Sequence, residues 1–345
     1  MKRLAPLVAL VFVSGCASLE YYAQAVGGHL EVIRLAVPIE ERLREADTPE
    51  PLRAKLAKAL AIREFASREL ALPDNGSYRR YADIGRPFVV WNVFAAPEFS
   101  VKPVESCFLF AGCVSYRGFY SEEAAQRHAA ALAGQGYDVY VGGVAAYSTL
   151  GWFSDPVLSS FIHYPESEVA RIVFHELAHQ VVYLKGDTIF NESFATTVEE
   201  EGVHRWLERQ GTPAQRAAYD GSRRRRSEFV ALVIKYRGGL AEFYDRPAEP
   251  EEKRAGKRRL FSAMQDEYKA LKDSWGGLTG YDRLFERGAN NALLASVASY
   301  SELVPAFRAM LAQKDGDLPV FYDAVRELAK LDKAERDARL AVPGR

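Results

Sequence analysis

Apolar residues recur at spacings of three and four over most of the chain, and this pattern predicts a protein rich in helices. From Leu19 to Leu72 the pattern is largely helical, with breaks near Pro38 and around Thr48-Pro49. Ser121 to Gly134 is predicted to form a further helix, and after Gly211 the pattern is almost entirely helical. Helices are therefore expected at both ends of the fold.

A central stretch changes to the pattern of β-strands. Residues 88–94 and the region around Cys107 and Cys113 are rich in β-branched and aromatic side chains, and Tyr137 to Thr149 has the same character. We expect Val139 to Thr149 to form a sheet edge, where an extended peptide could pair with its backbone. An interior strand is the alternative.

The segment from Glu166 to Leu184 is predicted to be a helix, with Pro165 before it and Gly186 after it. Its apolar positions share one helical face: Val169, Ile172, Val173, Leu177 and Val181. This pattern is typical of a helix that is buried on one side.

The same helix contains His175-Glu176-Leu177-Ala178-His179. Histidines four residues apart on a helix project to the same side, so both imidazoles can reach one Zn²⁺ ion, with Glu176 beside an open position. A carboxylate there can take a proton from metal-bound water and return it to a leaving amine. The motif thus indicates peptide-bond hydrolysis, the alternative being histidines that only form hydrogen bonds in a core.

A second helix is predicted from Asn191, as N-cap, to Gln210. Glu192, in its first turn, is the favoured third metal ligand, and Glu199 lies two turns later, where it could orient a ligand. Compensation of the helix dipole is the alternative for Glu192. The run Glu199 to Glu201 contains the fallback ligands, and it could also be a solvated acidic surface.

These residues resemble the ligand helix of the gluzincin metallopeptidases. Asn191 to Ala195, with Glu199, is similar to the N-E-G-F-A-x-x-x-E pattern of the aminopeptidase N family. The resemblance implies zinc bound by His175, His179 and Glu192, Glu176 as general base and Glu199 behind a ligand. The connection between the motifs is shorter than in that family, and its amine-anchoring G-x-M-E-N segment is absent, so exopeptidase specificity stays open.

Nearly the whole chain is similar to the predicted aminopeptidase lipoprotein family of Gram-negative bacteria. The segments that carry this resemblance are Tyr78 to Asp83, Ala146 to Phe153, Phe174 to Gln180 and Asn290-Asn291-Ala292. We therefore expect a zincin-like, helix-rich α+β fold, with a small mixed sheet packed on the zinc helix and a helical C-terminal lobe.

The N-terminus predicts a signal peptide over residues 1–15. Lys2 and Arg3 precede a short apolar run, and Val13 to Cys16 resembles a bacterial lipobox. Cleavage before Cys16 and acylation of that cysteine would anchor the protein to a membrane, with the outer membrane and the periplasmic face as the expected location. A secretory signal followed by an incidental cysteine is the alternative.

The mature chain is expected to contain a part over residues 16–211, with the sheet and the zinc site, and a helical lobe over 212–345, or to be one continuous domain. Without Lys2 and Arg3 it has 43 basic against 46 acidic residues, which gives no electrostatic basis for nucleic-acid binding. Cys107 and Cys113 form an even pair in an oxidising compartment, so a disulfide is favoured over two buried thiols.

The predicted function is zinc-dependent peptide hydrolysis, most simply as an aminopeptidase acting on a peptide or protein substrate. An endopeptidase of envelope proteins, or a non-catalytic lipoprotein with a structural metal, are the alternatives. The oxyanion of the transition state needs a donor, and Tyr281, Tyr300 and His204 are the candidates. The oligomeric state is not indicated by the sequence.

Overall fold

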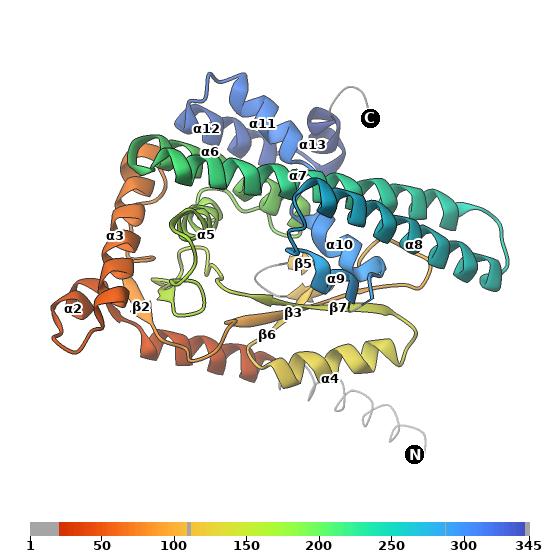
Figure 1. The fold of residues 1–345 in the computed structure, drawn as a ribbon, viewed down its shortest axis with the longest axis horizontal. Helices are drawn as coiled ribbons and strands as arrows, with labels where there is room; N and C mark the ends of the chain where they lie inside the picture. Colours follow the sequence, from red (N-terminus) through yellow and green to blue (C-terminus); the bar gives the residue numbers. More distant parts are fainter. Residues whose placement is uncertain (1–20, 109–111, 287, 342–345) are drawn as a thin grey trace, which may run out of the picture.

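The computed structural model describes residues 21–108, 112–286 and 288–341. Within them the chain is a helix-rich α+β protein, as predicted, in which most of the helices surround short strands (Figure 1). In this part of the chain no helix combines the length and apolar content needed to cross a membrane. The predicted signal peptide and Cys16 lie outside the described residues.

The first part of the chain is helical and broken at two prolines. A helix over residues 21–35 is followed by α2 (Ile39–Arg44) and α3 (Glu50–Leu70). Pro38 and Pro49 occupy the N-cap positions of α2 and α3, where the missing N–H of proline removes no helical hydrogen bond. Both predicted breaks are thereby confirmed.

A three-stranded antiparallel sheet forms the middle layer of the fold, in the order β6 (Arg117–Phe119), β3 (Val90–Ala96) and β7 (Asp138–Val144). Helices α4 (Glu122–Ala133) and α10 (Asn291–Ser299) cover its two faces (Figure 1). Trp91 and Val93 pack toward α4, whereas Phe94 and Ala96 pack toward α10, because alternate residues of a strand point to opposite faces.

Among the described residues β7 lies at an edge of this sheet, so the predicted edge strand is confirmed. It ends at Val144 instead of Thr149. The reason is that the chain leaves the sheet there, and the carbonyl of Ala145 accepts a hydrogen bond from Ser160 Oγ.

Two smaller sheets contain the other strands of the described residues. The first is mixed, with β1 (Val37–Pro38) antiparallel and β8 (Val157–Leu158) parallel to β2 (Arg80–Ala82). The second pairs β4 (Ser106–Phe108) with β5 (Gly112–Val114). Cys107 and Cys113 face each other in it and form the predicted disulfide.

Helices α5 (Glu166–Ala178) and α6 (Thr188–Gln210) pack against each other within the largest hydrophobic core. That core extends across the predicted boundary at residue 211. The ring of Phe194 in α6 contacts those of Phe307 in α11 (Val304–Ala312) and Phe321 in α12 (Leu318–Ala329).

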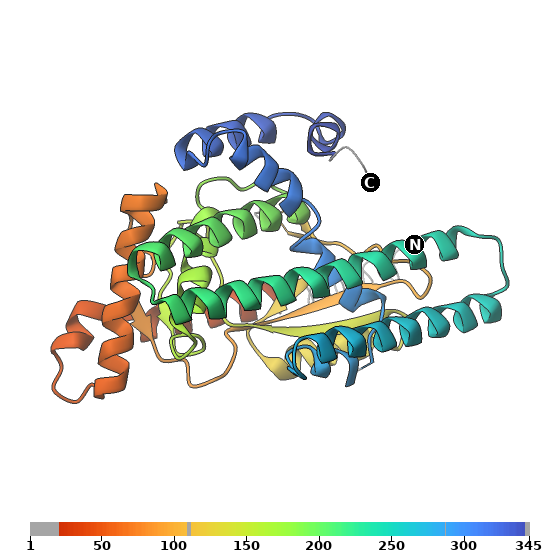
Figure 2. The same ribbon diagram turned by 45° about the horizontal axis from the view of Figure 1, so that its top comes forward.

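The C-terminal part is helical, as predicted. Helices α7 (Pro213–Asp245) and α8 (Pro250–Ser274) lie side by side as a long hairpin with its own apolar core (Figure 2). The other helices after α8 are α9 (Asp282–Glu286), α10, α11, α12 and α13 (Lys333–Leu340). Figure 1 shows α11 and α12 on the side of the molecule opposite the helix over residues 21–35.

Candidate metal centre

Helix α5 begins where the sequence predicts it, after Pro165 and with Glu166 and Glu168 in its first turn. It ends at Ala178, earlier than the predicted Leu184, because the chain turns after His179 to bring α6 back against α5. The backbone N–H and C=O of Leu184 are then bound by the side chain of Asn191, not by a helical turn.

Helix α6 begins at Thr188, three residues before the predicted start. Asp187 is its N-cap and accepts a hydrogen bond from the backbone N–H of Phe190. The prediction of Asn191 as N-cap was wrong, because that buried side chain holds the α5–α6 connection instead. The earlier start still leaves Glu192 in the first turns of α6, facing α5.

The predicted ligands His175, His179 and Glu192 come together, and all three are buried. Nε2 of His175 lies 3.2 Å from Nε2 of His179 and 3.1 Å from Oε2 of Glu192. The remaining pair, His179 Nε2 and Glu192 Oε2, is 3.8 Å apart. Of the fallback candidates, Glu200 pairs with Arg308 and Glu201 with Arg205. Glu199 contacts the other ring nitrogen of His175 and so lies behind this ligand.

The chemistry of these three atoms fits a metal ion. Nδ1 of His175 lies 2.8 Å from Glu199 Oε2 and must donate, because a carboxylate only accepts. In a neutral imidazole, Nε2 of His175 then directs a lone pair toward Nε2 of His179 and a carboxylate oxygen of Glu192. Three such atoms suit a cation held between them, since four-coordinate zinc with bonds near 2.0–2.1 Å would separate its ligand atoms by roughly 3.3 Å.

Without a metal, a proton on His175 supplies the positive charge between these atoms. Burial lowers the pKa of His175, but hydrogen bonds to Glu192 and Glu199 outweigh burial and raise that pKa to about 10. Burial lowers the pKa of His179 to about 4. Burial raises the pKa of Glu192, yet the two histidines hold it below its usual value. Binding of a divalent ion would therefore displace a proton from His175.

Glu176 follows His175 and is half-buried. Burial raises its pKa to about 7; the charge of His175 opposes this shift, and Glu192 and Asp155 add to it. A carboxyl group whose pKa lies near neutral pH can both accept and return a proton under physiological conditions.

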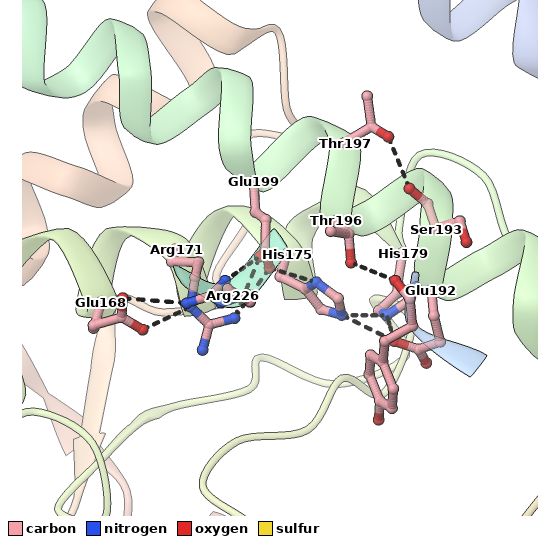
Figure 3. A network of polar contacts seen from close by, with 11 residues as sticks. Glu168, Arg171, His175, His179, Glu192, Ser193, Thr196, Thr197, Glu199 and Arg226 are labelled. Atoms are coloured by element: carbon pink, nitrogen blue, oxygen red, sulfur yellow. Dashed lines mark hydrogen bonds and ion pairs between the residues drawn. The ribbon is translucent and has the colours of Figure 1, made fainter. Parts of the chain in front are cut away.

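Figure 3 shows Glu199 between His175 and two arginines. Arg171 of α5 lies 3.2 Å from the Glu199 carboxylate and Arg226 of α7 lies 3.5 Å from it. Glu168 pairs with both arginines. Burial raises the pKa of Glu199, but Arg171 and the other cations hold it at about 2, so Glu199 stays charged behind His175.

The sequence analysis missed both arginines. Arg171 precedes His175 by four residues on the same helix, a spacing that could have identified it. Arg226 offers no local signal, because it lies 27 residues from Glu199 on another helix. Arg226 belongs to a run of four arginines, Arg223 to Arg226, in which Arg224 is largely exposed, with a side-chain exposure of 69%.

Of the three oxyanion candidates, only Tyr300 lies at the metal centre. Its ring stacks on that of His175, with 6.4 Å between the ring centroids. Tyr281 was a wrong candidate, because its ring stacks on Phe229 in the core of α7 and α8. His204 is also excluded, since it is exposed and pairs with Glu208.

Two further tyrosines lie near the ligands and were not predicted. The ring of Tyr183 contacts that of His179, with 6.3 Å between centroids. Tyr116 is close enough to Glu192 that this carboxylate, after burial, raises its pKa.

The Asn290-Asn291 signature acts at a distance from the ligands. Asn290 donates to the carbonyl of Val139, and the N–H of Asn291 donates to Asp138. These bonds fasten α10 to the edge strand, and Tyr300 follows directly at the end of α10.

Comparison with known proteins identifies the family of the chain. No curated protein and no solved structure matches the chain. The family model described as a putative aminopeptidase matches residues 20–340, which include all the residues of the centre. The chain belongs to this aminopeptidase family.

Proposed function

We propose that the protein is a zinc metallopeptidase with a zincin-like active site, acting most simply as an aminopeptidase. The observation that carries this proposal is the convergence of His175, His179 and Glu192 with Glu176 beside them. A zinc ion held by the three residues would supply a Lewis acid for the scissile carbonyl and for water. A purely structural metal site has no use for the carboxylate of Glu176.

The protein's own residues have distinct parts in this reaction. A carboxylate oxygen of Glu176 accepts the proton of the attacking water and returns it to the leaving amine. Glu199 accepts a hydrogen bond from the Nδ1–H of His175 and so keeps Nε2 directed at the site. Tyr300, beside His175, is the proposed donor to the oxyanion. The edge strand β7 offers backbone groups to an extended substrate.

We also propose that acylated Cys16 anchors the enzyme to the outer membrane on its periplasmic face, where envelope peptides would be its substrates. An endopeptidase acting on envelope proteins is the second candidate. It is favoured by the absence of the amine-anchoring G-x-M-E-N segment.

The Glu176→Gln substitution tests the reaction. The variant should bind zinc as the wild type does, while hydrolysis of aminoacyl and internally quenched peptides falls about 10²- to 10⁴-fold. Glu208→Gln, which changes an exposed carboxylate, is the matched control and should retain activity. If the wild type and the Glu176→Gln variant both bind zinc and neither cleaves any peptide of a broad library, the proposal is contradicted. Cleavage by the wild type confined to free N-termini would support an aminopeptidase.

A further inference from the structure

The helix over residues 21–35 exposes an apolar face. Tyr22, Val26 and Leu30 follow one another at a spacing of four, so they lie on one side of the helix, with 37%, 57% and 57% of their surface exposed. No Asp, Glu, Lys or Arg occurs from residue 21 to residue 30. A water-facing helical face normally carries charged residues, which make up 26% of this chain.

The opposite side of this helix is fastened to the protein. The ring of Tyr21 stacks on Phe108, and Val32 is fully buried in the main core. Gln24 accepts a hydrogen bond from the backbone N–H of Tyr120. The exposed apolar side is therefore presented by a docked helix.

An ordered turn extends this surface. Trp152 and Phe153 are 78% and 51% exposed, and the ring of Phe153 lies 4.6 Å from that of His29 on the helix. Thr149 donates to Asp155 from its N–H and its hydroxyl, and the N–H of Phe153 donates back to Thr149 Oγ1. These bonds fix the turn that presents the two aromatic side chains.

Together these exposed side chains form a surface that we call the apolar face: Tyr22, Val26, Leu30, Trp152 and Phe153. We infer that the apolar face lies in the interfacial layer of the bilayer that holds the lipid on Cys16. This inference rests on the lipid anchor of the proposed function. Only residues 17–21 separate Cys16 from Tyr22, so the chain can reach no farther than roughly 20 Å from the anchor. Tryptophan and tyrosine favour the membrane interface, because their rings are apolar and carry a polar group.

A second copy of the chain fits the apolar face less well. Its five residues expose roughly 600 Å² together, whereas a stable protein interface needs about 800 Å² from each partner. A bilayer imposes no such minimum, because the acyl chains on Cys16 already hold the protein at the surface.

The apolar face is connected to the metal centre. Gly151, next to Trp152, lies against the side chain of Gln180, which directly follows the ligand His179. Gln180 also bonds Asn75 and Ser77. A membrane-bound apolar face would therefore fix the orientation of the metal centre relative to the lipid surface.

Trp152 is a natural probe for this arrangement, because the other three tryptophans, Trp91, Trp206 and Trp275, are at least 91% buried. The full chain, purified from membranes, is reconstituted into phosphatidylcholine vesicles with brominated acyl chains, which quench only indole groups near the lipid. We expect roughly twofold or greater loss of the Trp152 emission, defined as the emission that Trp152→Phe removes.

The double variant Val26→Glu, Leu30→Glu should abolish this quenching. Val320→Glu changes an exposed residue of α12, a helix on the opposite side of the molecule, and should preserve the quenching. Unchanged zinc content and peptidase activity show that each variant is folded. Trp152 emission that brominated lipid does not quench overturns the inference. So does shielding of Trp152 from aqueous acrylamide without lipid, in step with dimer formation. The mass of the N-terminal peptide tests the anchor separately, so either proposal can fail alone.

Discussion

At the scale of single residues, the two histidines of the motif have unequal environments although they lie four positions apart. His175 is held between Glu192 and Glu199, whereas Nδ1 of His179 is buried without a hydrogen-bond partner among the described residues. The orientation of His175 is therefore fixed by charged neighbours. The orientation of His179 depends on packing against groups such as the ring of Tyr183.

Arg226 provides a test of this arrangement. Arg226→Gln removes one of the two cations on Glu199 and should weaken zinc binding about tenfold, measured by competition with a chromogenic chelator. This loss of affinity is at the lower end of the range expected for residues that support a metal ligand, because Arg171 still pairs with Glu199. Arg224→Gln alters a neighbouring arginine that does not contact Glu199 and should bind zinc like the wild type. Equal affinities of the two variants would show that Arg226 does not support the centre.

The buried carboxyl group of Asp155 should make the stability of the fold depend on pH. Burial raises its pKa to about 6, and two hydrogen bonds from Thr149 only partly oppose this. An unfolded aspartate titrates near pKa 3.9, so the folded state binds the proton more tightly, and this stabilisation disappears as the pH rises through 6. Asp155→Asn removes the titration. Its free energy of unfolding, relative to wild type, should therefore rise by about 2 kcal/mol between pH 4.5 and 7.5 in urea titrations. A difference that is independent of pH would contradict the prediction.

At the scale of elements, Gly202 allows α6 to approach its neighbours. A Cβ at this position would lie 2.7 Å from Leu70 of α3 and 2.7 Å from Phe174 of α5, and both side chains are fully buried. Gly202→Ala should therefore lower the free energy of unfolding by about 1–3 kcal/mol. Gly238→Ala in α7 meets no atom within 4 Å and should raise it by about 0.5–1 kcal/mol, through helix propensity. Chemical denaturation measures both, and effects of the same sign would refute this reading of the helix contacts.

The helices and strands that the sequence predicts correctly are those with local signals. Pro38, Pro49 and Pro165 stand at helix starts, and the nearly continuous apolar run of β3 suits a strand that is covered on both faces. The start of α6 was misplaced because Asp187 and Asn191 are equally suitable N-caps locally. Only the packing of the α5–α6 connection, which uses the Asn191 side chain, decides between them.

At the scale of the whole molecule, the centre combines parts that no local pattern relates. The ligands could be predicted because all three lie within one helix pair. Tyr300 was only one of three candidates from the sequence. It lies beside His175 because it follows α10, which the Asn290-Asn291 pair fastens to the edge strand. Arg226 reaches Glu199 from α7, a contact that depends on how the long helical hairpin lies on α5 and α6.

Metal removal should therefore destabilise the whole chain. A metal that binds only the folded state adds about 4 kcal/mol to the free energy of unfolding when its free concentration is a thousand times its dissociation constant. Because the ligands join α5 and α6 inside the largest core, a chelator should lower the thermal midpoint of the entire protein. Glu192→Ala lacks one ligand, so its midpoint should be lower from the start and should respond little to chelator or added zinc. If wild type and Glu192→Ala responded equally to chelator, the stabilising metal would have to lie outside the His175, His179 and Glu192 site.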